Sequence, residues 1–173
     1  MIVSTNRHRP NRFKSYRETH ETVMMQFMDQ NFVNAETLEF MPYPDGFNLK
    51  GEISCLGQIV IDVDKFLDIL NGEGDNATVQ TRWYSYNVLV RNCGNVLRYD
   101  NQDENYLRSG HQDEHHKHLF DWETRIEQQD SPFWIGQNCF PTLGDVLQEV
   151  QEWYWQNRSY LPCPDTYSEI GLR

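Results

Sequence analysis

The chain has 173 residues and a formal net charge of −11, and 13% of its residues are aromatic. This length suits one domain that buries its own core, and the aromatic content argues against disorder. No apolar run approaches the roughly 18 residues of a membrane-spanning helix, and no hydrophobic leader opens the chain, so we expect no membrane association. Four widely spaced cysteines without a C-x-x-C pair indicate reduced thiols and a cytoplasmic location.

The charge is unevenly distributed along the chain. Residues 1–17 carry five basic side chains and no acidic one, so the acidic excess belongs to the remaining residues. Such a basic arm could contact phosphate groups or an acidic protein surface, and the simpler interpretation is a solvated terminus. Because an acidic body repels polyanions, any contact with nucleic acid has to be local. Self-association is compatible with this pattern but is not required by it.

The first half of the chain predicts one helix and two strands. Apolar residues recur at near-helical spacing from Ser15 to about Phe32, which indicates an amphipathic helix. Residues 47–54 and 58–63 have the alternation typical of strands. Asp64 could then cap a short helix or continue as an extended edge.

A long hairpin is the clearest element. Residues 78–91 are rich in β-branched and aromatic side chains, and residues 92–95 form a turn that leads into a returning strand. With Cys93 and Gly94 as a two-residue loop, Asn87 would face Asp100. Alternation then divides the side chains between two faces. The polar face would hold Ser85, Asn87, Arg91, Arg98 and Asp100, and the core face would hold Tyr84, Tyr86, Val88, Val90, Leu97 and Tyr99.

After the hairpin, the chain reads as irregular and very polar to about Ser131. Thr142, with Asp145 three residues later, resembles a capping box. A helical stripe of apolar residues follows and ends near Asn157.

The densest group of titratable residues is a set of four histidines within eight positions: His111, His115, His116 and His118. Histidine can accept and donate a proton near neutral pH, and two histidines with a cation can cleave a phosphodiester through the RNA 2′-hydroxyl. In this hypothesis His115 and His118 transfer the protons. Lys117 and Arg98 would contact the phosphate, and Asp100 would orient a histidine.

This chemistry needs no cofactor, and RNA is the expected substrate. Tyr86 or Tyr99 could stack on a base. The remaining residues expected to bind substrate are Arg91, His111 and His116.

Two other interpretations use the same segment. If it is helical, His111, His115 and His118 share one face at i, i+4 and i+7. With Asp100 or Asp121 nearby, this set could hold a zinc or manganese ion and serve a metal-dependent nuclease. The segment could also be a hydrated loop without function, and the ion pair of Arg98 with Asp100 could be purely structural.

A non-enzymatic binding module is the alternative from a different class. The basic arm and the aromatic tail from Trp153 to Tyr160 would then dock a protein or nucleoprotein partner. The sequence has no phosphate-binding G-x-x-x-x-G-K-[ST] loop, dinucleotide fingerprint or G-x-S-x-G elbow, which excludes those enzyme classes.

The run GNVLRYDN at Gly94–Asn101, followed by HHKHL at His115–Leu119, resembles the TumE family of bacterial toxins. The resemblance covers about residues 47–155. It leaves the N-terminal helix with its basic arm, an acidic stretch at 122–138 and the aromatic tail as additions.

The resemblance implies an α+β fold with an antiparallel sheet. Combined with the two helices that the apolar spacing predicts, the expected architecture is an antiparallel sheet with an N-terminal and a C-terminal helix packed on one face. The resemblance also implies a growth-inhibiting toxin that a cognate antitoxin neutralises. The additions leave room for another role, as a subunit of a larger antiphage defence or nucleic-acid-processing complex. Three segments are then expected: an arm and helix at 1–46, a TumE-like core at 47–157 and a tail at 158–173.

Overall fold

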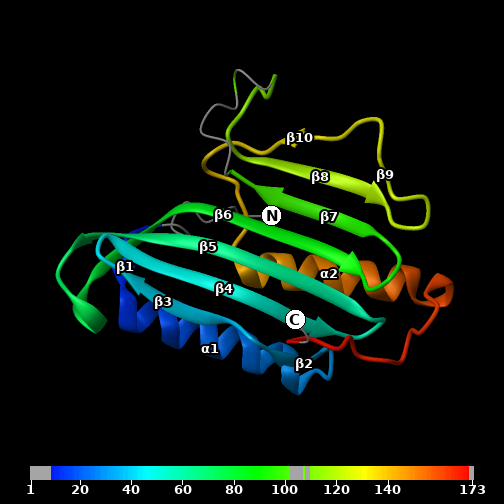
Figure 1. Cartoon of the computed structure of the whole chain (residues 1–173), viewed down its shortest axis with the longest axis horizontal. Coiled ribbons are helices and arrows are strands. Elements are labelled where there is room, and N and C mark those ends of the chain that lie inside the picture. Colours follow the sequence, from blue (N-terminus) through cyan, green and yellow to red (C-terminus); the bar gives the residue numbers. More distant parts are fainter. Residues whose placement is uncertain (1–8, 102–106, 108–109, 172–173) are drawn as a thin grey trace.

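One antiparallel sheet forms the frame of the molecule (Figure 1), and the computed structural model describes residues 9–101, 107 and 110–171. The long strands are β4 (Gly46–Cys55), β5 (Ile59–Asn71), β6 (Thr78–Val90), β7 (Asn95–Asp100) and β8 (His116–Asp121). The short strands are β1 (Asn11–Arg12), β2 (Val33–Glu36), β3 (Glu39–Tyr43), β9 (Ile126–Glu127) and β10 (Phe133–Trp134). The strand order is β10-β8-β7-β6-β5-β4-β2, with β1 on β6, β3 on β4 and β9 on β8.

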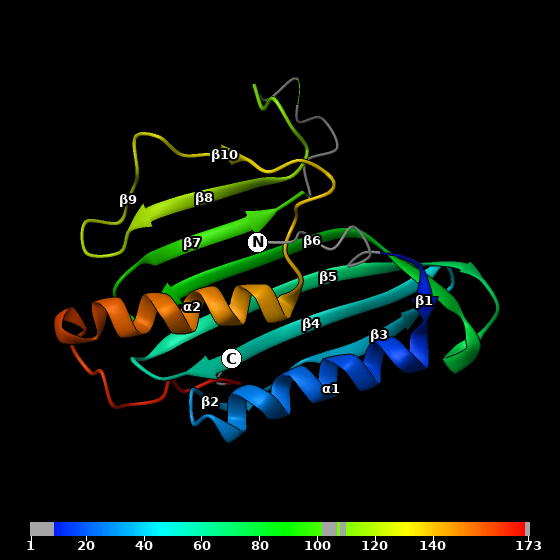
Figure 2. The ribbon, with the colours of Figure 1, turned by 180° about the vertical axis from the view of Figure 1, so that it is seen from behind.

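Two helices cover the same face of this sheet, as the views in Figures 1 and 2 show together. They are α1 (Phe13–Asp29) and α2 (Leu143–Asn157), and 3-10 turns occur at η1 (Gly74–Asn76) and η2 (Arg158–Tyr160). The expected α+β architecture, with both helices on one face, is confirmed. Neither helix in the described part of the chain is long and apolar enough to cross a membrane.

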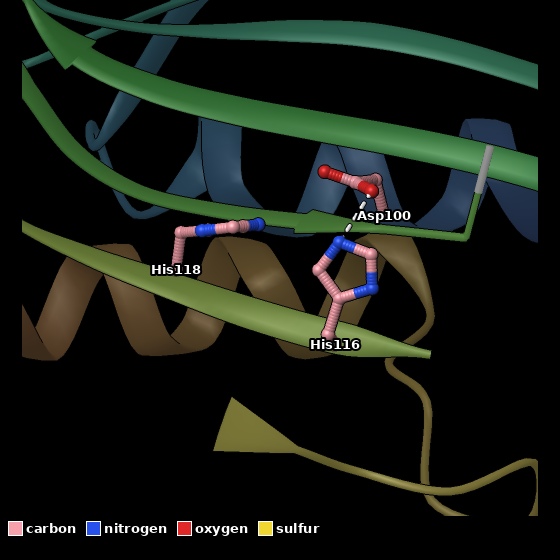
Figure 3. A group of neighbouring side chains, drawn as sticks. All are labelled: Asp100, His116 and His118. Carbon is pink, nitrogen blue, oxygen red and sulfur yellow. Dashed lines mark ion pairs between the residues drawn. The ribbon is translucent and has the colours of Figure 1, made fainter. Parts of the chain in front are cut away.

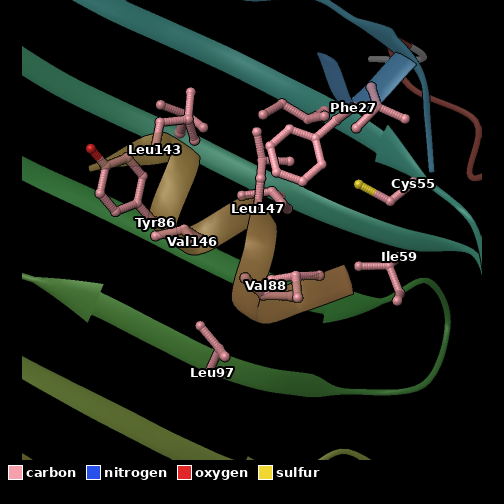
Figure 4. Close-up of a cluster of buried hydrophobic side chains, with 14 of the residues drawn as sticks. Phe27, Cys55, Ile59, Tyr86, Val88, Leu97, Leu143, Val146 and Leu147 are labelled. Carbon is pink, nitrogen blue, oxygen red and sulfur yellow. The ribbon is translucent and has the colours of Figure 1, made fainter. Parts of the chain in front are cut away.

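The core lies between the sheet and the two helices (Figure 4). Alternation along β6 points every second side chain at the helices, and those of Tyr84, Tyr86 and Val88 are fully buried there. From the other side, Phe27 of α1 and Leu147 of α2 pack into the same cluster. The burial of these apolar stripes fixes which face of each strand meets the helices.

The hairpin of β6 and β7 differs from the predicted register by two residues. Arg98, not Asp100, lies opposite Asn87, and Asp100 lies opposite Ser85. The connection uses residues 91–94 instead of a two-residue loop, and the register is irregular near that end of β6. Because the shift is an even number of residues, every side chain stays on its predicted face.

The region between the hairpin and Ser131 is not irregular, which corrects the prediction. It contains β8, which pairs along β7, and β9, which returns along β8. The histidine-rich segment is therefore extended, and its helical interpretation is wrong. The prediction missed this strand because both faces of β8 carry polar or charged side chains, so it shows no apolar alternation.

Other segments join the same sheet. The chain after Asp64 stays extended within β5, and residues 33–43 pair with β4 as β2 and β3. Residues 1–8 of the basic arm, Arg7 included, lie outside the described residues. In the tail, the side chains of Trp155 and Tyr160 are exposed.

The predicted capping box of α2 is present. Thr142 accepts a hydrogen bond from the Asp145 backbone N–H at 3.2 Å, and the Asp145 carboxylate accepts one from the Thr142 N–H at 2.8 Å. We expect Thr142→Ala to lower the free energy of unfolding by about 1 kcal/mol, because the first turn of α2 loses a cap. Urea denaturation measures this. Thr22→Ala, on the exposed surface of α1, is the control and should change stability by less than half as much.

Candidate functional site

The face of the sheet that the helices leave uncovered carries two rows of polar residues, which we call the polar face. One row crosses four strands from Asp62 through Asn87 and Arg98 to His118. The neighbouring row runs from Asp64 through Ser85 and Asp100 to His116. Because directly opposed residues in a sheet point to the same side, the pairing of β7 with β8 brings Arg98, Asp100 and two histidines together.

Asp100 is the hub of this group. One of its carboxylate oxygens, Oδ1, lies 2.8 Å from His116 Nε2, and the other accepts a hydrogen bond from Arg98 Nε at 2.6 Å. Burial acts to raise the pKa of Asp100, but the hydrogen bonds and positive charges of His116 and Arg98 outweigh burial and lower it. Asp100 is therefore ionised at neutral pH.

His116 is fixed at both ring nitrogens. Its Nδ1 lies 2.9 Å from the backbone oxygen of Glu114, so both nitrogens face acceptors. Burial acts to lower the pKa of His116, but the hydrogen bond and charge of Asp100 outweigh it, and the pKa is raised. Proton donation from both nitrogens requires the charged imidazolium form.

The two ring nitrogens of His118 differ in their surroundings. Its Nδ1 lies 2.6 Å from the Glu127 carboxylate, which also accepts a hydrogen bond from Ser131 Oγ at 2.6 Å. Its Nε2 is buried and has no hydrogen-bond partner among the described residues. Burial lowers the pKa of His118 and, together with the charges of Arg98 and His116, outweighs the opposing effect of Glu127. The ring is therefore neutral at pH 7, with Glu127 holding the Nδ1 proton and Nε2 left as an acceptor.

Three ligand-type atoms converge at this point. His116 and His118 each direct one nitrogen toward Asp100, and one such atom from each of the three residues lies within 4.8 Å of the others (Figure 3). We call Asp100, His116 and His118 the triad. Arg98 and Glu127, with 38% and 40% of their side chains exposed, link this largely buried group to solvent.

Two further rings lie beside the triad. The ring centroid of His111 is 4.5 Å from that of His116 and 5.5 Å from that of Trp134. Trp134 is opposite His116 in the pairing of β10 with β8, so it lies over the same face. Of the four clustered histidines, the structure therefore brings three together.

His115 is the fourth, and it lies on the opposite side of β8. Its ring is stacked on Phe140 with centroids 4.5 Å apart, and its Nδ1 lies 3.1 Å from the Tyr84 hydroxyl. This placement corrects the expected pairing of His115 with His118, because adjacent residues of a strand point to opposite faces. The same alternation excludes the metal set of His111, His115 and His118.

Lys117 and Tyr99 also face the helices instead of the polar face. Lys117 Nζ pairs with the Glu149 carboxylate of α2 and lies 5.0 Å from the ring centroid of Tyr99. The Tyr99 hydroxyl donates to the same carboxylate at 2.6 Å. The expected contact of Lys117 with phosphate and the expected stacking of Tyr99 on a base are therefore wrong. Both side chains instead attach the sheet to α2.

Two residues of the expected binding set lie elsewhere. Tyr86 is fully buried in the core, so no face of its ring is left for a base. Arg91 follows β6 at the end away from the triad, where it pairs with Glu52 at 3.8 Å and donates to the backbone oxygen of Glu169. Neither residue reaches the site.

A family model described as Toxin TumE matches residues 21–154. The chain belongs to the TumE toxin family. The match begins within α1 and ends within α2, so it includes the whole polar face and starts earlier than the resemblance at about residue 47 indicated. No curated protein and no solved structure matches the chain.

Membership in the TumE family makes this protein a toxin of a toxin–antitoxin system, with a cognate antitoxin as its partner. The expected resemblance is thereby confirmed at the level of the family.

Glu127 and Trp134 of this TumE-family toxin are site residues that no sequence pattern predicts. Glu127 stands in an acidic stretch nine residues after His118, where no motif singles it out. If residues 116–121 are assigned to a strand, Glu127 can be placed at the site. The pairing of β8 with β9 puts Glu127 opposite Phe120, on the same side of the sheet as His118. The useful signal was therefore strand parity, not residue type.

Proposed function

We propose that this toxin cleaves RNA in the cytoplasm and that the triad with Arg98 and Glu127 is its chemical centre. The observation that supports the proposal is the state of His118: a neutral ring, held by Glu127 at Nδ1, whose acceptor Nε2 has no hydrogen-bond partner among the described residues. A histidine oriented in this way by a carboxylate is equipped to act as a general base.

The proposed reaction is transfer of the phosphoryl group to the neighbouring ribose oxygen. His118 Nε2 takes the proton of the 2′-hydroxyl, the 2′-oxygen bonds to phosphorus, and the bond from phosphorus to the 5′-oxygen breaks. The leaving 5′-oxygen takes its proton from the His116 imidazolium, which gives up one of its two contacts, with Asp100 or with the backbone oxygen of Glu114, in this step. Arg98, a partly exposed cation, stabilises the charge on the phosphoryl oxygens. The products are a 2′,3′-cyclic phosphate and a 5′-hydroxyl.

A second candidate, a metal-dependent nuclease, is favoured by a specific observation. Both triad histidines have Nδ1 next to an acceptor, Glu114 O and Glu127 Oε1, while Nε2 points at the common centre. Metal-binding histidines have this arrangement, because the outer acceptor fixes the tautomer. Two imidazoles and a carboxylate suit zinc, manganese or iron. A bound cation would supply Lewis-acid stabilisation of the phosphoryl oxygens.

RNA cleavage by the purified toxin tests the proposal and separates the two chemistries. Labelled RNA and DNA of the same sequence are incubated with the toxin, with and without EDTA, alongside His118→Asn and the control His115→Asn from the other face of β8. Metal-independent cleavage of RNA alone, with a 2′,3′-cyclic end, supports the histidine mechanism. Loss of cleavage in EDTA supports the metal site. Absence of cleavage under all conditions contradicts both chemistries and leaves a toxin that acts as a non-enzymatic binding module.

Metal binding can be measured without activity. We expect Mn²⁺ or Zn²⁺ to raise the unfolding temperature of the dialysed protein if the triad holds an ion. A free metal concentration of a hundred times the dissociation constant corresponds to about 2.7 kcal/mol of stabilisation of the folded state. His118→Asn should lose this shift, whereas His115→Asn should keep it. Equal shifts in both variants would place the ion elsewhere and reject the metal site.

A further inference from the structure

A cavity of about 460 Å³ lies on the helix side of the sheet, away from the triad. It is bounded by the first half of α1, the first turn of α2 and the strands β5 and β6. Figure 2 shows both helices beginning toward the same end of the sheet. Leu67 and Val79 provide apolar surface in the wall, and Tyr16 and His20 provide polar groups. The volume is that of a typical site for a small molecule.

The charge of this cavity is opposite to the charge of the chain. Lys65 and Arg9 line it, and in the described part of the chain no Asp or Glu is among its lining residues. This is unexpected in a protein with 26 acidic residues and a net charge of −11. The electrostatic potential inside the cavity therefore favours an anion.

Lys65 is a buried cation in the wall of this cavity. The residue is only 4% exposed, and none of the ion pairs between described residues includes it. Its Nζ lies 5.3 Å from the ring centroid of Tyr16. Lysine is almost never buried without a counter-charge, because removing an ammonium group from water costs several kcal/mol.

The described groups around Lys65 favour its charged ammonium form but provide no carboxylate to pair with it. Burial acts to lower the pKa of Lys65, but the phenol groups of Tyr16 and Tyr86 outweigh burial and raise it, so the ammonium form persists at neutral pH. Burial and the nearby Lys65 charge lower the pKa of His20 to about 4, so that ring is neutral. Asp145, in the first turn of α2, is engaged by the backbone N–H and hydroxyl of Thr142.

We propose that this cavity binds a small organic anion, whose phosphate or carboxylate group pairs with Lys65 and whose apolar body lies against Leu67 and Val79. Such a ligand would provide the counter-charge that no described residue gives Lys65, and it would bury apolar surface in the same step. The site is independent of the proposed RNA cleavage, since the sheet separates Lys65 from the triad.

Phenyl phosphate and benzoate are suitable probes, because each joins one anionic group to an apolar ring. Titration calorimetry on the full chain is expected to show binding of one or both, with inorganic phosphate and phenol weaker than the matching probe. Lys65→Met keeps the shape of the side chain and removes its charge, so affinity should fall at least tenfold. Lys50→Met, on the polar face beside Asp64, is the matched control and should bind normally. Failure of both probes to bind, or equal affinity in Lys65→Met, overturns the proposal.

A second measurement keeps the test decisive if Lys65→Met does not fold. The His20 ring lines the same cavity, so an anion at Lys65 should shift its NMR resonances in the unmodified protein and raise its pKa from about 4. Binding without any change at His20 overturns the placement. RNA cleavage by a folded Lys65→Met variant should equal that of the unmodified toxin, which separates this site from the proposed function.

Discussion

Replacement of His118 with asparagine is expected to abolish RNA cleavage and the toxicity of the protein on expression. General base catalysis contributes about 10² to 10⁴ in rate, and asparagine removes the acceptor nitrogen at Nε2 while keeping a polar side chain. Glu127→Gln should have a smaller effect, a loss of about 10- to 100-fold, because Glu127 orients the ring and does not itself take the proton. Single-turnover cleavage of a labelled RNA measures both effects.

The matched control is His115→Asn, three residues away in sequence but on the other face of β8. Its ring stacks on Phe140 in the space between sheet and helix, so this substitution should affect stability more than the rate. Cleavage that is lost equally in His115→Asn and His118→Asn, with both proteins folded, would contradict the assignment of the polar face.

The pH dependence of cleavage gives an independent check on His118. The ring acts as a base only when it is unprotonated, so activity should fall as the pH decreases through its pKa. Because burial, Arg98 and His116 together lower that pKa, the acidic limb should lie below the ordinary value of 6.5. Glu127→Gln removes an opposing negative charge and should move the limb to still lower pH. A limb above 6.5 would be inconsistent with His118 as the base.

Much of this fold is predictable from the sequence, because apolar periodicity survives in the elements that build the core. The helix near Ser15–Phe32, the long strand with Tyr84, Tyr86 and Val88 and the capping box at Thr142 all carry patterns set by burial on one side. The two-residue error in register had no consequence for the faces, because side chains repeat every two residues along a strand.

The site was predictable in composition but not in arrangement. Arg98, Asp100 and a histidine cluster were identified, yet the choice among His115, His116 and His118 depends on strand parity. The sequence of β8 does not show which alternate residues face the helices, because Lys117 on one face and the histidines on the other are all polar. What distinguishes the faces is the partner of each side chain: Glu149 from α2 for Lys117, and Asp100 from β7 for His116. Neither contact is local in sequence.

Replacement of Asp100 with asparagine is expected to cost about 3 kcal/mol of unfolding free energy. Asp100 is largely buried between His116 and Arg98, and removing one member of a buried ion pair leaves its partners without compensation. The matched control on the same face is Asp64→Asn. It breaks the more exposed pair with Lys50 at 3.2 Å and should cost at most about 1 kcal/mol. Urea denaturation in EDTA gives both values, and equal costs would show that Asp100 is not the hub.

The stability difference between the unmodified protein and Asp100→Asn should itself depend on pH. His116 has a raised pKa in the folded state, so its stabilising charge is complete below its ordinary value of 6.5 and is lost as the pH rises through the folded value. Asp100 has a lowered pKa, so its contribution is complete above its ordinary value of 3.8 and is lost as the pH falls through the folded value. The difference should therefore be largest between about pH 3.8 and 6.5 and decline on both sides. In Asp100→Asn the pKa of His116, followed by NMR, should fall, because burial is then opposed only by the backbone oxygen of Glu114. A pH-independent difference would mean that packing, not the charge on Asp100, holds β7 against β8.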